Sequence, residues 1–254
     1  MGLNTSPTPP RGRLAPSPTG RLHLGNAFAF LTAWLDIRSL GGSLVLRIED
    51  IDPLRSRPVY AASIMQDLAW LGLDWDEGPE LGGSFGPYMQ SERLKNYEAF
   101  LENLEERGLV YPCYCTRKEL RTLASAPHIG DEGAPYPGTC RRLNAQERQE
   151  MERHGRRASL RLDTDASQVF LGTGEAQIRF EDMVMGRQSF DMRANGGDFA
   201  LRRSDGVFAY QLAVAADDAD MGVSRVVRGE DLLLSTPRQV LLFQLMGKPP
   251  PSYA

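Results

Sequence analysis

Residues 13–25, RLAPSPTGRLHLG, decide the fold that this sequence predicts. They have the pattern of a strand end, a loop broken by Pro16 and Pro18, and a helix that opens with a His-x-Gly step at His23. The unpaired N–H groups and the positive dipole end of such a helix start attract anions, and His23 can donate a hydrogen bond to an oxygen that gains charge. The stretch therefore predicts a nucleotide-phosphate site, although P-x-P-T-G before a helix is also typical of an ordinary loop.

The residues around this stretch predict a strand, helix, strand and helix over 11–74. Residues 43–49 carry an apolar run between a Gly-Gly turn and an acidic turn, as a buried parallel strand does. Two parallel strands need a crossover helix, which residues 24–40 supply. Further helices are expected over 58–72, where Pro58 fits the first turn, and over 91–107. This is half of a doubly wound nucleotide-binding fold.

The pattern changes after residue 110. Residues 111–204 contain Cys, Pro and Gly punctuation, an arginine-rich helix and short strands at 177–180 and 186–191, which indicates an inserted subdomain. An αβ pattern then resumes, with a helix at 210–218, a strand at 225–228 and a helix at 237–246. The expected domains are a disordered tail (1–10), a first half of the catalytic domain (11–110), the insertion (111–204) and a second half (205–254).

The composition bounds the function. With 254 residues and 41% apolar content the chain can bury one or two cores, and a net charge of −4 argues against a generally basic nucleic-acid coat. The stretch between residues 141 and 161 contains seven arginines and only three glutamates, which predicts either a local RNA-binding patch or a solvated helical face. Three cysteines and no apolar run long enough for a membrane favour a reducing, cytoplasmic location.

Cys113, Cys115 and Cys140 form a second constellation. Two thiolates two residues apart and a third after a loop can supply three corners of a tetrahedral zinc site, which would staple an insertion with little core. His128 is the conventional chemical candidate for the fourth corner. The alternative is that the three cysteines are structural and unrelated.

Five segments, in this order, carry a family resemblance: APSPTGRLHLGN (15–26), LRIEDIDPLRSRP (46–58), GPYMQSERLKNYEAF (86–100), FAYQLAVAADDADMGVSRVVRGEDLL (208–233) and STPRQ (235–239). In them the chain resembles the class I aminoacyl-tRNA synthetases of the glutamyl type. The resemblance implies an α/β fold, namely a Rossmann-like doubly wound class I catalytic domain with an inserted zinc-containing subdomain of the acceptor-binding type. It also implies ATP, with Mg²⁺, and L-glutamate as substrates.

The resemblance carries over site residues position by position. It implies glutamate binding by Arg13, Ala15, Ser17, Glu49, Tyr210 and Arg228, ATP binding by Pro16, Thr19, Gly20, His23 and Asn26, and catalysis by His23, Gly25 and Asn26. Each residue suits its role, since arginines pair with carboxylates and a glutamate can hold an ammonium group. Asn26 departs from the family pattern, which has a second histidine there, and asparagine cannot become cationic.

Two further features refine the expectation. The C-x-C … Y-x-x-x-C spacing resembles the zinc motif of the glutamyl-Q tRNA(Asp) branch of the family, which implies Cys113, Cys115, Tyr136 and Cys140 as ligands and favours Tyr136 over His128. The family's lysine-containing loop is not in the chain, and Lys248 lies in a segment that leads toward it in the family. We therefore expect the chain to be truncated before that loop.

The expected activity is ATP-dependent activation of L-glutamate and its transfer to the queuosine base of tRNA(Asp). The tyrosine spacing, the IEDIDP wording at 48–53 and a catalytic core that nears its end by residue 254 favour this branch. The closest alternative is a catalytic-domain fragment of a glutamyl-tRNA synthetase that charges tRNA(Glu). Asn26 and the missing lysine loop motivate a third hypothesis, a non-catalytic tRNA-binding paralogue.

Overall fold

The computed structural model describes residues 8–116, 118–120 and 136–254, in which the chain forms two compact units. The first unit contains residues up to 94, 218–229 and 251–254, and the second contains 95–217 and 230–250. Residues 1–7 of the expected tail lie outside the described residues, as does His128.

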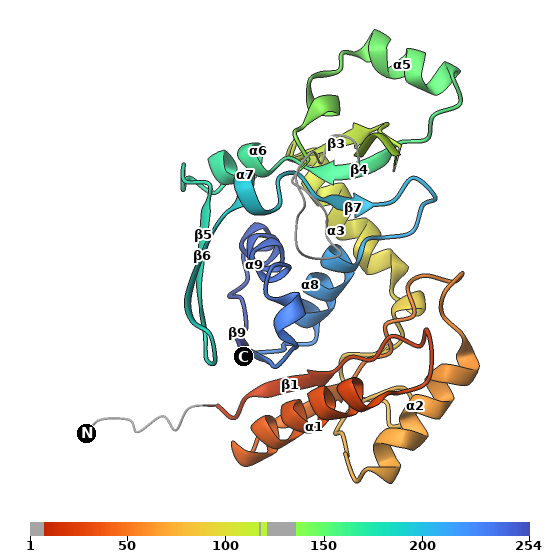
Figure 1. Ribbon diagram of the computed structural model, residues 1–254, viewed down its shortest axis with the longest axis vertical. Helices are drawn as coiled ribbons and strands as arrows, with labels where there is room; N and C mark the ends of the chain where they lie inside the picture. The colour runs from red at the N-terminus through yellow and green to blue at the C-terminus, as the bar shows by residue number, and fades with distance from the viewer. Residues whose placement is uncertain (1–7, 117, 121–135) are drawn as a thin grey trace. The chain divides into compact units, whose positions relative to one another are not determined.

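The first unit contains parallel strands, two of which are connected by a crossover helix. Its elements are β1 (Arg11–Leu14), α1 (Leu24–Ser39), β2 (Ser43–Leu46), α2 (Pro58–Trp70), the 3-10 turn η1 (Gln90–Glu92), β8 (Arg225–Val226) and β9 (Ser252–Tyr253). β1 and β2 pair in parallel from Arg11 opposite Ser43 to Leu14 opposite Leu46, and α1 connects them (Figure 1). On the other side of β1, Ser224 before β8 donates its backbone N–H to the carbonyl of Arg11 at 2.9 Å, and β8 pairs in parallel with β9. The chain therefore leaves β1 toward one side and later returns on the other.

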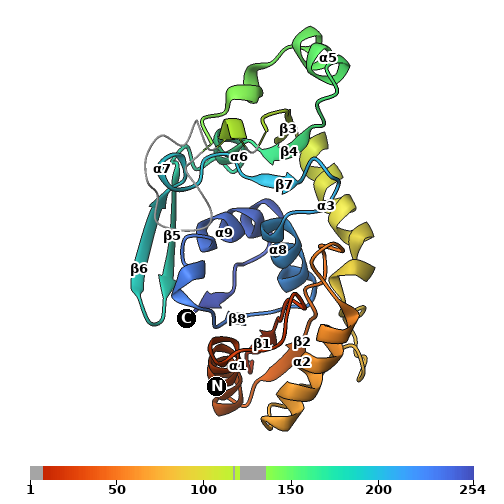
Figure 2. The same cartoon turned by 45° about the vertical axis from the view of Figure 1, so that its right-hand side comes forward.

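The core of the first unit lies between these strands and the two helices. Its buried apolar residues include Leu14, Ile37, Leu44, Leu46, Ile48, Ile64 and Leu68. Gly12 lets α1 approach β1 closely, because a Cβ atom at this position would lie 2.4 Å from Cγ1 of Ile37. Figure 2 shows β1 and β2 side by side with both helices nearby. Packing at this contact fixes the direction in which the start of α1 faces the end of β1.

The second unit contains two separate antiparallel groups of strands. Its elements are α3 (Leu94–Glu106), β3 (Val110–Cys113), η2 (Thr139–Arg142), α5 (Ala145–Arg153), β4 (Ser159–Leu162), α6 (Thr164–Phe170), β5 (Gln177–Asp182), β6 (Gly186–Asp191), α7 (Met192–Asn195), β7 (Ala200–Arg202), α8 (Tyr210–Asp220), η3 (Glu230–Leu232) and α9 (Thr236–Leu245). The end of α8 from Asp218 belongs to the first unit. β3, β4 and β7 form one antiparallel sheet, while β5 and β6 form a hairpin in which Phe180 and Phe190 stack.

The expected elements are present with small differences at their ends. The strand predicted over 43–49 is regular only as far as Leu46, although Ile48 still donates to Tyr88 and Glu49 to Pro16, and Ile48 forms an isolated bridge with Met89. The helix predicted over 91–107 begins at Leu94, after η1. None of the helices within the described ranges combines the length and hydropathy needed to cross a bilayer.

Candidate functional site

The loop after β1 is fastened to the segment that follows β2. The carbonyl of Leu14 accepts from the N–H of Arg47 at 2.9 Å, that of Pro16 from Glu49 at 2.9 Å, and that of Pro18 from Arg57 at 3.0 Å. Since proline has no N–H, Pro16 and Pro18 can offer only their carbonyls to the neighbouring segment. The loop therefore runs beside the IEDIDP segment into the start of α1.

His23 caps this start of α1. Its Nδ1 accepts from the backbone N–H of Asn26 at 3.4 Å, so a neutral ring carries its proton on Nε2, which can donate outward. Gly25 makes room for the imidazole, because a Cβ atom there would lie 3.2 Å from both Cε1 and Nδ1 of His23. The His-x-Gly step thus holds an exposed donor over a helix N-terminus, where anions are favoured.

A buried chain of alternating charges lies at the same end of β1. Arg47 donates from Nη1 to Oδ1 of Asp218 at 2.7 Å and from Nη2 to Oε1 of Glu49 at 3.0 Å. Asp218 also pairs with Arg13, whose Nε lies 3.5 Å from Oδ2. Burial raises the pKa of Glu49, while the Arg47 and Arg13 guanidinium groups oppose that rise. The structure therefore brings together Arg13 and Glu49, which sequence reasoning placed in one site.

Arg228 approaches this cluster from β8. Arg13 donates from Nη1 to the carbonyl of Val227, the residue before Arg228, at 3.4 Å. The guanidinium carbon of Arg228 lies 5.2 Å from the ring centre of Tyr253 in β9. Burial and the negative charge of Asp218 raise the pKa of Tyr253, and the charges of Arg13 and Arg228 both act against them. Both arginines that were predicted to bind carboxylates therefore lie close enough to the buried Tyr253 hydroxyl to lower its pKa.

The other predicted residues divide between the two units. Ala15, Ser17, Thr19 and Gly20 lie in the loop after β1, with Ser17 and Thr19 exposed, and Asn26 lies in the first turn of α1. Tyr210 begins α8 in the second unit and is about one-third exposed (37%).

The three cysteines and Tyr136 converge in the second unit. The Sγ atoms of Cys113, Cys115 and Cys140 lie within 4.8 Å of one another, with Cys115 and Cys140 at 3.6 Å. The Tyr136 hydroxyl is 3.4 Å from Sγ of Cys113 and 3.4 Å from Sγ of Cys115. Ligands that surround zinc tetrahedrally at about 2.3 Å for sulfur and about 2.0 Å for oxygen lie roughly 3.5–3.8 Å apart. The Cys115–Cys140 separation and the two Tyr136–sulfur separations lie near these values, so the three-cysteine group could hold a zinc ion.

The surroundings treat the thiols unequally. Burial opposes ionisation of Cys113, but hydrogen bonds from Tyr136 and the backbone, together with the charge of Arg161, lower its pKa. Burial and the neighbouring thiols raise the pKa of Cys115 to about 12. The guanidinium carbon of Arg161 lies 4.2 Å from the centre of the Tyr136 ring. Cys113 is therefore favoured as a thiolate, and a cation beside the two thiols would lower the pKa of Cys115.

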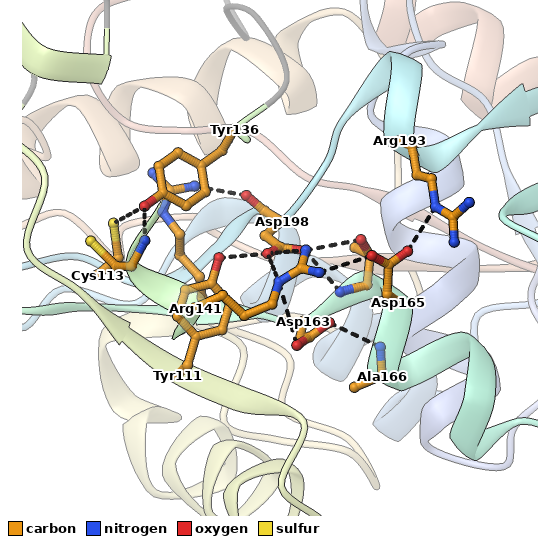
Figure 3. Close-up of polar contacts among 12 residues, drawn as sticks. Tyr111, Cys113, Tyr136, Arg141, Asp163, Asp165, Ala166, Arg193 and Asp198 are labelled. Atoms are coloured by element: carbon orange, nitrogen blue, oxygen red, sulfur yellow. Dashed lines mark hydrogen bonds and ion pairs between the residues drawn. The ribbon is translucent and has the colours of Figure 1, made fainter. Parts of the chain in front are cut away.

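Asp198 fastens the segments that carry these donors (Figure 3). Its side chain is completely buried and accepts from the Tyr111 hydroxyl at 2.5 Å, from Arg141 Nε at 2.9 Å and from the N–H and hydroxyl of Thr164 at 2.9 and 3.0 Å. Its carbonyl accepts from Arg161 Nη1 at 2.8 Å, and Gly197 before it pairs with Tyr136. This network ties β3, η2 and β4 around the sulfur atoms.

The arginine-rich segment is only partly a solvated face. Arg141 belongs to the Asp198 network, Arg161 covers the Tyr136 ring, and Arg156 pairs with Glu119 through both guanidinium ends at 3.0 and 2.9 Å. Arg142, Arg153 and Arg157 are exposed. The stretch therefore contributes internal structure as well as surface charge.

Sequence reasoning missed four residues that organise these sites: Arg47 and Asp218 in the first unit, and Arg161 and Asp198 in the second. Arg47 is the first residue of the RIED stretch, and Asp218 stands in a run of acidic residues. For Arg47 the available signal was a charged residue directly after the apolar run at 44–46, because a charge placed among apolar residues needs a buried partner.

Comparisons with known proteins agree with this geometry. Residues 11–254 match the family described as tRNA synthetases class I (E and Q), catalytic domain. The chain is 59% identical over 243 residues to a glutamyl-Q tRNA(Asp) synthetase of Nitratidesulfovibrio vulgaris, an alignment that covers 96% of this chain and 72% of the relative. A glutamyl-Q tRNA(Asp) synthetase of Symbiobacterium thermophilum is 52% identical over 243 residues, covering 95% and 72%.

A solved structure extends the comparison. The glutamate tRNA ligase from Elizabethkingia meningosepticum, in complex with its amino acid, matches with a TM-score of 0.80 and 30% identity. The match covers 97% of this chain and 49% of that chain, so this chain spans about half the length of the solved ligase.

Proposed function

The chain belongs to the class I tRNA synthetase (E and Q) family, and from that premise we propose that it activates L-glutamate with ATP and transfers it to the queuosine base of tRNA(Asp). Two relatives named glutamyl-Q tRNA(Asp) synthetase are 59% and 52% identical, whereas two relatives named glutamate–tRNA ligase are each 46% identical. The difference in identity favours the queuosine-directed activity over the charging of tRNA(Glu).

The observation that carries this proposal is the linked group of Arg13 and Glu49 at the end of β1, beside the His23-capped start of α1. In open α/β sheets ligands bind beyond the carboxyl ends of strands where the chain turns to opposite sides, as it does at β1. In the proposed site Glu49 holds the substrate ammonium, Arg13 and Arg228 hold carboxylates, and Ala15 and Ser17 add contacts to glutamate. The family resemblance also implies Tyr210, which belongs to the second unit. A buried arginine left facing a neutral amide would disfavour glutamine.

The nucleotide is held at the start of α1 in this proposal. Pro16, Thr19 and Gly20 shape the loop, Nε2 of His23 donates to a phosphate oxygen, and Asn26 supplies a neutral donor. The reaction joins two anions, because a glutamate carboxylate attacks the α-phosphorus of ATP and pyrophosphate leaves. Donors fixed before the reaction stabilise the charge that develops without the cost of reorganisation, and Mg²⁺ arrives with ATP as part of that substrate.

The test is glutamate-dependent exchange of pyrophosphate into ATP by the full-length protein. We expect exchange without any tRNA and a strong loss with Arg228→Ala. Exchange that requires tRNA(Glu) would instead assign the protein to the tRNA(Glu)-charging enzymes. Absence of exchange under both conditions would favour a tRNA-binding paralogue. Transfer of labelled glutamate to tRNA(Asp) with and without queuosine then identifies the acceptor.

The second part of the proposal concerns the insertion over 111–204. Cys113, Cys115, Tyr136 and Cys140 hold a structural zinc ion, and the subdomain contacts tRNA. The spacing of the donor atoms supports this, since the Cys115–Cys140, Tyr136–Cys113 and Tyr136–Cys115 separations of 3.6, 3.4 and 3.4 Å lie near those of a tetrahedral zinc site. When bound, zinc would link β3 to η2 and stabilise a region with few buried apolar side chains.

Metal analysis tests the zinc site. We expect near-stoichiometric zinc in the purified protein and its loss in Cys113→Ser. Tyr136→Phe should weaken zinc retention against a chelator, while His128→Ala should leave it unchanged. The opposite pattern would move the fourth ligand to His128, and a folded, metal-free protein would reject the site.

A further inference from the structure

We infer that Arg47 and Asp218 are positioning residues that hold Arg13 and Glu49 in the arrangement needed for glutamate; the inference rests on the function proposed above. Both residues are buried, and Arg47 is 0% exposed. Neither of these two side chains is therefore expected to contact a bound substrate. Their effect on a substrate must pass through the side chains that they contact.

The contacts form a continuous path between the two residues assigned to substrate. The two ends of the Arg47 guanidinium reach different carboxylates, Asp218 at 2.7 Å and Glu49 at 3.0 Å. The two oxygens of Asp218 likewise reach different arginines, Arg47 through Oδ1 and Arg13 through Oδ2 at 3.5 Å. Moving either central residue would thus shift both outer ones.

Charge balance explains why this path suits an amino acid. Burial disfavours the charged form of Glu49, which must be an anion to hold an ammonium group, and the adjacent Arg47 is the strongest opposing influence. Asp218 contacts Arg13 at Nε and so orients its guanidinium group. The substrate presents an ammonium and a carboxylate at a fixed separation, so the two outer residues must themselves be held at a fixed separation.

Stability alone gives a poor reason for such a path. A buried ion pair often contributes no more to folding than well-packed apolar side chains of the same volume. Nη1 of Arg47 also donates to the thioether sulfur of Met221 at 3.8 Å, so this guanidinium is surrounded by a soft acceptor as well as by carboxylates. A role in positioning explains why charged side chains occupy places where apolar side chains could support the fold equally well.

The experiment compares wild-type full-length protein with Asp218→Asn and Arg47→Met. Asp218→Asn keeps the side-chain shape but removes the charge that orients Arg13 and Arg47. We expect the Kd of glutamate, measured by calorimetry, and the KM of glutamate in pyrophosphate exchange to rise about 10- to 100-fold, with the KM of ATP unchanged. Arg47→Lys, which keeps the charge but cannot span both carboxylates, should fall between the wild type and Arg47→Met.

Asp217→Asn is the matched control. Asp217 is the buried neighbour of Asp218 in α8, and its oxygens accept from the Tyr97 hydroxyl at 3.0 and 2.9 Å. This variant should lose stability while the KM of glutamate stays at the wild-type value. An equal rise in the glutamate KM for Asp217→Asn, or equal rises for glutamate and ATP in Asp218→Asn, would show a merely structural role and overturn the inference.

The remaining outcomes separate the inference from the function on which it rests. Wild-type protein that binds no glutamate would overturn the proposed function itself. Wild-type binding with unchanged glutamate affinity in both variants would overturn only the positioning role. If neither Asp218→Asn nor Arg47→Met folds, as judged by circular dichroism, the pair is required for the fold and the positioning role is rejected.

Discussion

Glu49 is a carboxylate that the fold buries and then surrounds with charge. Burial raises its pKa above the ordinary value of 4.5, Arg47 and Arg13 lower it, and Asp218 adds to the rise. The net result is a raised pKa at the residue proposed to hold the substrate ammonium. A protonated Glu49 has no charge to offer, so protonation and binding of glutamate should exclude each other.

We therefore expect the affinity for glutamate to fall as pH is lowered through the raised pKa of Glu49, at pH values above the 4.5 of an ordinary glutamate. Calorimetric titrations of wild-type protein with glutamate are made between pH 5 and pH 8, at about one titration per half pH unit. They check whether the affinity falls at a pH above the range in which an ordinary glutamate side chain titrates. Affinity that stays constant down to the ordinary glutamate range would contradict it.

The same shift predicts how stability depends on pH. Because the folded pKa is higher than the unfolded one, the folded state binds more protons between the two values, and the contribution of Glu49 to the free energy of unfolding decreases as pH rises through that window. Glu49→Gln lacks this dependence. The difference in unfolding free energy between wild type and Glu49→Gln, measured by urea denaturation, should decrease with rising pH and then level off.

Single residues also show what the sequence could and could not predict. His23 and Gly25 were expected from a local motif and Glu49 and Arg228 from the family resemblance, and the structure gives His23 and Gly25 a common role at the start of α1. The partnership of Arg47 with Asp218 spans 171 positions. No local pattern predicts a partner at such a distance. A charged residue within an apolar segment indicates that a carboxylate partner is needed, but it does not indicate which one.

Elements were predicted best where a long periodic pattern or a breaker marked them. The crossover helix, its flanking parallel strands and the β5–β6 hairpin follow from such signals, and the predicted α/β class I catalytic fold is confirmed. β4 and β7 have only four and three residues, too few to display an alternation. Their pairing depends on contacts with β3 and with each other, which lie far away in the chain.

The contact between β1 and α1 leaves no room for a methyl group at residue 12. A Cβ atom there would lie 2.4 Å from Cγ1 of Ile37, within the core. We expect Gly12→Ala to lower the free energy of unfolding by about 1–3 kcal/mol, the usual cost of overpacking. Ile37→Ala removes the clashing atoms, so the double variant should cost less than the sum of the two single changes in urea denaturation. Additive costs would show that the clash is absent.

Asp198 joins several elements of the second unit through one carboxylate. Replacement by asparagine leaves Arg141 and Tyr111 facing an amide, and we expect a loss of about 3 kcal/mol in unfolding free energy, since breaking a buried ion pair strands its partner. Asp165→Asn is the control, because that carboxylate is 40% exposed and its pairs with Arg141 and Arg193 should contribute less than about 1 kcal/mol. Equal losses in chemical denaturation would contradict the network's special role.

At the scale of the whole molecule, the chain passes between its two compact units several times. The first unit takes its residues from three stretches, and the chain first leaves it after Leu94. Compactness is a property of contacts between distant residues, and a shift in composition along the chain does not report it. Each unit has its own buried cluster, around Leu14 and Ile37 in the first and around Tyr111 and Cys140 in the second.

Separate clusters predict that losing the metal acts locally. The cluster around the sulfur atoms contains four buried residues, three of them among the proposed ligands, so without zinc its parts have little apolar surface to hold them together. We expect a chelator to remove hydrogen-exchange protection from β3 and η2 while the amides of β1, β2 and α1 keep theirs. The comparison uses the purified protein before and after 1,10-phenanthroline, with its non-chelating isomer as the control. Loss of protection in both units would mean that the metal supports the whole molecule, and no loss in either would mean that the Asp198 network holds β3 and η2 without it.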